Sequence, residues 1–466
     1  MTAPASRSAA ATGNGRLHEQ LVDGSLLSVV ARHGSFLALA MGSHALVNLV
    51  DLWLIGRLGA HAVAGVHVAT TVNFLPMIVG NGVSIASMAM ISRLLGAGRQ
   101  TAARVLGERA FTFMLLLGLG LGGLLALLTV PAVDLQRAVG EARAIGIHYL
   151  LVANLGTISM FALLQATASM RSAGEVVVPI ALVVGANLLN LVLDVVLLFG
   201  WPALGVPAMG APGAAYASVF ARGASALLGV FWLRRRSHPL RLRRLRWRGG
   251  RQEIVTMVAL GMPQSLQMAV RAGVVIALTA VATGLVGEVA QVTLSVTTRL
   301  DTVVLFAAAG YASAATTVVG FCAGAGHRDR ARRAARMAAW CAFVVGSLCA
   351  LALWHYAEPL FELFVASAEP AVLTMGASYL GIAVVGHAFG CYALGATGGI
   401  NGAGRMVPPL VLDAAVYLLV LPPALWLAAR NCAGSATLAP LWWSLTAVNV
   451  VLALAHAGYL RLARWV

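Results

Sequence analysis

Two polar stripes inside otherwise apolar stretches contain the residues best suited to chemistry. The first is His44, Asn48 and Asp51, spaced i, i+4 and i+7 within the apolar stretch 35–55. Residues at this spacing share one face of an α-helix. An ionised side chain at membrane depth costs about 2.5–3.5 kcal/mol on insertion scales, so such residues usually serve a function. Because apolar residues flank Asp51 on both sides, we favour a binding role over a helix end that faces water.

The second stripe consists of Asn187, Asn190 and Asp194, spaced i, i+3 and i+7 in another apolar stretch. This spacing again places three polar side chains on one helical face. Two expected helices, each with one acid among apolar neighbours, therefore contain the main candidates for a buried site.

The composition is that of an integral membrane protein. Hydrophobic residues make up 60% of the chain and charged residues 10%, whereas soluble domains average about 25% charged residues. The mean hydropathy is +0.86. All 32 basic residues are arginines, and most lie in short segments between apolar stretches. We therefore expect anionic membrane lipids, and no nucleic acid, as partners of this basic chain.

The chain is predicted to be an all-α polytopic membrane protein with twelve transmembrane helices, because about 20 apolar residues suffice to cross a bilayer. Residues 1–30 are polar and rich in small residues, which predicts a disordered N-terminal tail rather than a cleaved signal peptide. The expected spans are 34–56, 63–92, 110–133, 145–170, 176–200, 210–233, 255–283, 289–321, 337–357, 371–399, 406–429 and 436–460.

The arginines predict the orientation of the spans. The segments 93–109, 234–253 and 322–336, together with Arg171, Arg405 and the termini, contain 25 of the 32 arginines. The positive-inside rule places these segments in the cytoplasm. We therefore expect a multi-pass protein of the bacterial inner membrane with both termini cytoplasmic and with 234–253 as a basic cytoplasmic linker.

The two halves of the chain resemble each other. A single offset in the numbering aligns Gly56 with Gly284, Gly82 with Gly310, and the Gly-Ala-Gly sequence at 96–98 with that at 324–326. A constant offset through several glycine signatures indicates an internal repeat. The expected lobes are 31–233 and 254–466, each with six helices and the same sidedness, which is a parallel repeat with a substrate cavity between its halves.

These residues resemble the multidrug and toxic compound extrusion (MATE) transporters of the MOP flippase superfamily. The similarity rests on Val50-Asp51 followed by Gly56-Arg57-Leu58-Gly59, on the two Gly-Ala-Gly turns, on Met170–Gly174 leading to Pro179, and on the second polar stripe. The resemblance implies a two-lobed antiporter without a cofactor, which exports amphiphilic, drug-like compounds in exchange for H⁺ or Na⁺. We expect it to act as a monomer.

The resemblance also implies a cation-coupling site made of Asp51, Asn190, Asp194 and Ser218, where the family more usually has a threonine at the last position. His44, Asn48 and Asn187 would support it. Two carboxylates that converge in a cavity of low dielectric constant cannot both stay ionised cheaply, so the pair could hold a proton. Oxygen ligands at Asp51, Asn190 and Asp194 would equally suit Na⁺. The coupling ion stays open between H⁺ and Na⁺.

The second half differs from one branch of the family, because its seventh and tenth helices lack acids. The seventh has glutamines and Arg271, and the tenth has His387. Asp301 or Asp413 could instead pair with Arg271 or Arg299 across helices, mainly to neutralise charge. Aromatic, methionine and polar side chains are candidates for the wall of the substrate cavity: Phe74, Met77, Phe161, Gln165, Gln264, Gln267, Asp301 and Tyr311.

Three other functions need weighing. A lipid-linked oligosaccharide flippase, or another lipid flippase or metabolite exporter of the same superfamily, would share the lobed repeat, but the acidic set favours cation coupling. A membrane-embedded enzyme is disfavoured, because the chain has no His-Glu-x-x-His or Gly-x-Ser-x-Gly motif and no cysteine spacing typical of metal sites. A passive channel would not need two buried acids.

Overall fold

The computed structural model describes residues 24–235, 238–247, 249–364, 370–432, 438–463 and 465. These residues form α-helices, one short 3-10 turn and a single isolated bridge between Trp201 and Val206. The first half contains α2 (Leu26–Gly56), α3 (Ala60–Gly96), α4 (Gln100–Leu127), α5 (Thr129–Leu135), α6 (Gly140–Leu155), α7 (Thr157–Ser172), α8 (Val177–Phe199) and α9 (Ala211–Leu233). The second half contains α10 (Arg251–Val286), α11 (Glu288–Gly324), α12 (Arg328–His355), α13 (Ala357–Phe364), α14 (Pro370–Gly402), α15 (Val407–Leu419), α16 (Leu421–Cys432) and α17 (Ala439–Leu462).

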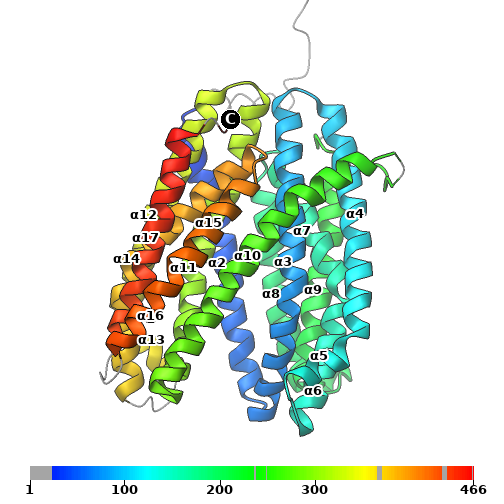
Figure 1. Cartoon of the computed structure of the whole chain (residues 1–466). Coiled ribbons are helices and arrows are strands. Elements are labelled where there is room, and N and C mark those ends of the chain that lie inside the picture. Colours follow the sequence, from blue (N-terminus) through cyan, green and yellow to red (C-terminus); the bar gives the residue numbers. More distant parts are fainter. Residues whose placement is uncertain are drawn as a thin grey trace, which may run out of the picture.

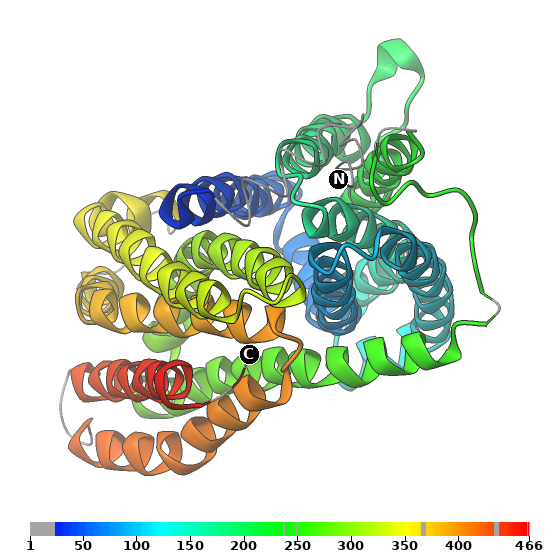
Figure 2. The same cartoon turned by 90° about the horizontal axis from the view of Figure 1, so that it is seen from above.

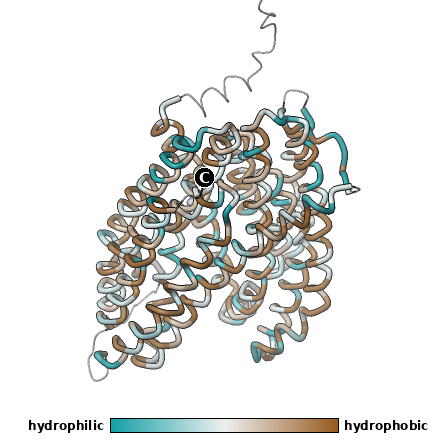
Figure 3. The backbone as a smooth tube through the Cα atoms, turned by 45° about the horizontal axis from the view of Figure 1, so that its top comes forward, coloured by the Kyte–Doolittle hydropathy of each residue, from teal (hydrophilic) through white to brown (hydrophobic). Residues whose placement is uncertain are grey.

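The predicted all-α membrane fold is confirmed. Among the described residues, eleven helical spans are long and apolar enough to cross a membrane, and α6 with α7, bent by 43° at Gly156, raises the number to twelve. Large apolar side chains such as Leu119 and Phe220 are more than half exposed on the outside of the bundle. Figure 3 shows mostly hydrophobic residues along the helices and hydrophilic residues at both ends of the bundle. This surface suits lipid around the helices and water at their ends.

Several expected helices are broken or longer than the sequence indicated. The single span expected at 145–170 is two helices that meet at Gly156, and the span expected at 406–429 is interrupted at Val420. Pro422 and Pro423 follow this interruption, and a proline cannot continue the helical hydrogen bonds before it. The helix α2 begins at Leu26, inside the expected tail 1–30, because Val29 and Val30 are buried against the protein. Residues 1–23 of that tail lie outside the described residues.

The internal repeat is visible in the helix bounds. The offset that relates α3 to α11 is the same at both ends of these helices, and it also relates α4 to α12. It further relates the left-handed backbone of Gly98, with φ of 72°, to that of Gly326, with φ of 83°. Only glycine adopts this conformation readily, so both Gly-Ala-Gly sequences form the same turn between helices. The predicted parallel repeat is therefore confirmed in the structure.

The two lobes exchange their first helices. Seen from above, α3–α9 form one bundle and α11–α17 the other, while the long helix α10 crosses from the first bundle to the second (Figures 1 and 2). The helix α10 packs on α3 of the first bundle before it reaches α15, and α2 correspondingly packs on α11 of the second bundle and on α8. Each lobe is thus tied to the other by one long helix.

Glycines at matching positions make the contact between the lobes. A Cβ atom on Gly96 would collide with the carbonyl of Phe321, and one on Gly324 would collide with the carbonyl of Arg93. These two contacts are equivalent, because the repeat relates Gly96 to Gly324 and Arg93 to Phe321. The guanidinium of Arg93 also donates to the carbonyl of Ala403, at 3.2 Å. The lobes therefore meet closely at the end of the molecule where the Gly-Ala-Gly turns lie.

Candidate cation-coupling site

The structure brings Asp51 of α2 and Asp194 of α8 together. The two helices pack against each other, and the carboxyl groups lie within hydrogen-bonding reach. The side chain of Asp194 is only 1% exposed. The Oδ1 atoms of both acids are buried and accept no hydrogen bond from the described residues. Buried carboxylate oxygens without a hydrogen-bond donor are costly. These oxygens could therefore bind a proton or a small cation.

Amide and hydroxyl groups complete one side of the pair. The Nδ2 of Asn190 donates to Asp194 Oδ2 at 3.1 Å, and the hydroxyl of Ser218 on α9 approaches Asn190 Oδ1 at 3.5 Å. Asn190 lies one helical turn before Asp194, so α8 orients the acid through its own neighbouring turn. The four residues expected at the site thus form one continuous polar cluster.

The supporting residues divide into two groups. His44 Nδ1 lies 3.3 Å from Asn187 Oδ1, and the amide of Asn187 donates to the Ser43 hydroxyl at 3.1 Å. These contacts form a second polar layer between α2 and α8, about two turns from the acids. Asn48 is exposed and no hydrogen bond joins it to this layer. The structure therefore unites His44 and Asn187 with the site and leaves Asn48 outside it.

Arg222 of α9 is a part of the site that the sequence analysis passed over. Its positive charge acts on Asp51, Asp194 and Tyr149, although no acid lies within ion-pair distance of it among the described residues. The spacing could have revealed it, because Arg222 follows Ser218 by four residues and so shares its helical face. Two carboxyl groups and one guanidinium therefore share a single site.

The second lobe contains a buried charge pair of a different kind. Asp413 of α15 is 0% exposed, and its Oδ2 accepts from Arg271 Nε at 2.8 Å and from Gln267 Nε2 at 2.9 Å. His456 Nε2 lies 3.6 Å from the other carboxyl oxygen and 3.2 Å from the Thr397 hydroxyl. The expected pairing of Asp413 with Arg271 is thus present. His456, a lone histidine in an apolar run, was missed.

Asp301 does not pair with an arginine. Its Oδ2 accepts from the Tyr379 hydroxyl at 2.6 Å, and its Oδ1 lies 2.9 Å from His387 Nε2. The side chains of Asp301 and His387 are 17% and 14% exposed, so this cluster is more accessible than Asp413. Histidine rather than arginine neutralises this acid, and histidine can change its charge near neutral pH.

Comparison with known proteins assigns the chain. The MatE family model matches residues 37–196 and 263–426, which is more than half of the sequence. The chain belongs to the MATE family. It is similar to the probable multidrug resistance protein YoeA of Bacillus subtilis, with 24% identity over 69% of this chain and 70% of YoeA. It is also similar to the FAD transporter of Shewanella oneidensis, with 24% identity over 81% of this chain and 82% of that protein.

The fold of this MATE transporter also occurs among solved structures. An outward-facing multidrug resistance MATE family transporter of the MOP superfamily superposes with a TM-score of 0.87 at 21% identity, covering 95% of this chain and 96% of that one. The family is one of multidrug efflux transporters rather than enzymes. The expected family and its two-lobed helical fold are therefore confirmed.

Several residues expected in the wall of the substrate cavity of the MATE transporter are buried in this conformation. Phe161 is 0% exposed and packs on Gly80 inside the first lobe, and Gln165, also 0% exposed, bonds to Ser87 at 3.0 Å. These two expectations are wrong for this conformation, because sequence cannot distinguish the interior of a lobe from a face between lobes. Phe74 is 40% exposed and Met77 is partly exposed.

Three further cavity candidates are buried and engaged in specific polar contacts. Gln264 accepts from Asn401 at 2.6 Å, and Gln267 donates to Asp413. The Tyr311 hydroxyl bonds to Ser35 at 2.7 Å, and its ring packs on the first helix. These three side chains hold helices together here and do not face an open cavity.

Proposed function

We propose that this MATE transporter is a secondary active antiporter that exports amphiphilic cationic compounds in exchange for a monovalent cation. The observation that carries the proposal is the approach of Asp51 and Asp194, each with an unpaired buried oxygen. Such a pair binds a cation or a cationic ligand, and it cannot accommodate both comfortably. Mutually exclusive binding at one acidic site is the physical basis of exchange.

The charges of the site support one cation in each cycle. Two ionised carboxylates and Arg222 sum to a net charge of about −1 before any ion binds. One H⁺ or one Na⁺ neutralises this charge, and a second would leave an uncompensated positive charge in a region of low dielectric constant. We favour H⁺, because two carboxyl groups this close to each other can share one proton and so avoid their mutual repulsion.

The contact between the lobes supports alternating access. The close contact at Gly96 and Gly324 forms a glycine seam between α3 and α11. This seam closes the end of the molecule that holds the arginine-rich turns, and the positive-inside rule makes this the cytoplasmic end. The site formed by α2 and α8 lies nearer the other end of these helices. We therefore propose that this conformation is closed toward the cytoplasm of a bacterial inner membrane. We propose that the protein acts as a monomer, and that rocking of its two lobes about the seam would expose the site to the cytoplasm.

Everted membrane vesicles test this function. Vesicles that hold a pH gradient are given cationic dyes with and without Na⁺, for the wild type and for Asp51→Asn. If proton exchange is correct, dye dissipates the gradient in wild-type vesicles without Na⁺, and the variant loses this response. A response that requires Na⁺ would identify Na⁺ as the coupling ion and leave the assignment of the site unchanged. Unchanged dissipation by Asp51→Asn would refute the site.

A second candidate is export of an anionic metabolite or lipid-linked compound. Arg299 of α11 has no acidic partner among the described residues, and a transporter named for FAD, an anionic dinucleotide, is among the relatives. A free arginine within a span favours an anionic ligand. The same vesicles separate the candidates, because an anion exporter would respond to FAD rather than to cationic dyes, and Arg299→Gln would abolish that response.

A further inference from the structure

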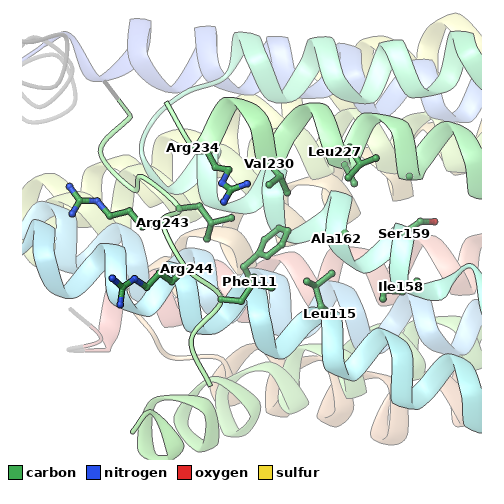
Figure 4. A pocket seen from close by; sticks show the side chains of 14 residues that line it. Phe111, Leu115, Ile158, Ser159, Ala162, Leu227, Val230, Arg234, Arg243 and Arg244 are labelled. Atoms are coloured by element: carbon green, nitrogen blue, oxygen red, sulfur yellow. The ribbon is translucent and has the colours of Figure 1, made fainter. Parts of the chain in front are cut away.

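A groove on the outer side of the first lobe lies apart from the cation-coupling site. It is a cavity of about 480 Å³ between α4, α7 and α9, beneath the segment that leads to α10. Its walls are almost entirely apolar, with Leu115, Ile158 and Leu227 along its length. Figure 4 shows these side chains lining the groove, with arginines gathered at one end. The groove therefore combines a long apolar wall with a positively charged end. This arrangement matches the acyl chain and the anionic headgroup of a lipid.

The arginines at this end are available to a ligand. Arg234, Arg243 and Arg244 line the groove, are exposed, and form no ion pair with the described acids. The neighbouring acids are all engaged elsewhere. Arg109 holds Glu253 at 2.5 Å, and Glu175 lies 3.6 Å from His238 and accepts from the Trp232 indole at 3.2 Å. Among the described residues, these three positive charges are thus left without a counter-ion.

A buried acid fixes the segment that presents them. Glu108 is 1% exposed, and its carboxylate accepts the backbone N–H groups of Arg243 at 3.0 Å and Arg244 at 3.4 Å. It also lies 2.7 Å from Arg246 Nε. Glu108 uses the backbone of the two residues and leaves their guanidinium groups free. Leu240 and Leu242, which precede these two arginines, are buried, so this part of the segment is held against the lobe.

We propose that this groove binds one anionic phospholipid, with its phosphate at Arg234, Arg243 and Arg244 and one acyl chain along the apolar wall. Charge complementarity commits the site to an anionic headgroup, and the apolar groove requires a chain attached to it. A cationic substrate is repelled by the arginines. A free phosphate leaves the groove without an occupant, so a phospholipid such as phosphatidylglycerol satisfies both features.

Native mass spectrometry of the purified, delipidated protein tests this site. Phosphatidylglycerol, phosphatidylcholine with the same chains, and glycerol phosphate are titrated separately. The double variant Arg243→Gln/Arg244→Gln removes charge, and Gly223→Leu fills the groove, since a side chain on Gly223 meets only Ser159 at 3.7 Å. Arg235→Gln is the matched control, because Arg235 belongs to the same segment and stacks on Trp232 outside the groove.

We expect one phosphatidylglycerol bound to the wild type at least roughly tenfold more tightly than phosphatidylcholine. Each arginine near a headgroup contributes roughly fivefold in affinity, so the double variant should lose roughly twentyfold, and Arg235→Gln should match the wild type. Gly223→Leu should lose binding with its charges intact. If this variant unfolds, Leu227→Ala, at an exposed position, should still weaken binding several-fold.

Three results would overturn the proposal. Equal binding of the two lipids would remove the role of the arginines. Phosphatidylglycerol binding by Gly223→Leu and Leu227→Ala at wild-type strength would show that the groove does not hold the acyl chain. Displacement of phosphatidylglycerol by equimolar glycerol phosphate would identify a phosphate site instead of a lipid site.

Discussion

The two lobes have the same helices and turns but hold their buried acids in opposite ways. In the first lobe, Asp51 and Asp194 face each other with unpaired oxygens, and no arginine touches them among the described residues. In the second lobe, Arg271 contacts Asp413 directly at 2.8 Å. A paired buried charge is a structural element, whereas like charges brought together oppose folding and persist where they serve a function. The comparison therefore supports the proposal that ion coupling takes place in the first lobe.

The features that the lobes share are geometric. The Gly-Ala-Gly turns, the α3–α11 seam and the exchanged helices α2 and α10 follow the repeat closely. The repeat does not extend to the charged residues, because the positions that correspond to Asp51 and Arg222 in the second half are Thr279 and Val450. The repeat thus sets the helical framework of both halves, whereas the charged residues differ between them.

The largest expected effect concerns the buried acids and stability. Breaking a buried ion pair costs about 3–5 kcal/mol, because it leaves a charge unpaired. Asp413→Leu should therefore lower the free energy of unfolding by about this amount, and adding Arg271→Met should restore most of it. Asp194→Asn should leave stability unchanged or raised, since it relieves repulsion. Denaturation in detergent measures all three, and a large loss for Asp194→Asn would contradict the contrast between the lobes.

The next effect concerns the seam that both lobes share. Gly96→Ala and Gly324→Ala each place a Cβ atom against a backbone carbonyl of the other lobe. Overpacking costs about 1–3 kcal/mol, so each variant should populate this conformation at least roughly fivefold less and slow dye transport to a similar degree. Gly56→Ala and Gly284→Ala are matched controls, because nothing lies within 4 Å of a Cβ atom there. Unequal effects of the two seam variants would contradict the equivalence of the two seam contacts.

A moderate effect is expected at Arg222. Its positive charge disfavours a proton on the neighbouring acids, so Arg222→Gln should move the pH profile of transport to more alkaline pH. Because Arg222 forms no direct ion pair with these acids among the described residues, a shift of roughly one pH unit or less is expected. The rate of dye transport, measured across pH, gives the shift, with Arg235→Gln as the control. A profile that moves toward acid would contradict the sign.

The smallest effect is a surface difference between the lobes. Arg143 bonds Asp134 at 2.6 Å and holds the pKa of that carboxyl below its usual range. The corresponding position in the second half is Glu362, without such a partner among the described residues. The stabilisation is therefore present at neutral pH and lost as the pH falls through the lowered pKa. Asp134→Asn should lower the melting temperature slightly at pH 7 and not at pH 3, and Glu362→Gln should change neither.

The sequence predicted the acidic cluster well, because each acid interrupts a long apolar run at helical spacing. Asp51, Asn190, Asp194 and Ser218 indeed meet in the structure. Arg222 was overlooked, since a single arginine in a span has no spacing signal until Ser218 is considered with it. Charge, spacing and hydropathy together were sufficient to predict the cluster but not the nearby positive charge of Arg222.

The fold was predictable in its repeat and not in its detail. Glycines at a constant offset revealed the two lobes, because turns and close contacts both require the smallest side chain. The bend at Gly156 and the burial of Phe161 depend on which faces of the helices pack together. Hydropathy is similar for a face toward lipid, a lobe interior and a cavity, so one sequence cannot distinguish them.

Proton release on substrate binding tests the central claim most directly. Purified protein in weakly buffered detergent is mixed with a cationic dye, and the pH change gives the protons released for each dye bound. The wild type and the double variant Asp413→Leu/Arg271→Met should each release about one proton. Asp194→Asn should release none. Full release from Asp194→Asn, or its loss only when Asp413 is replaced, would place coupling in the second lobe and contradict the account.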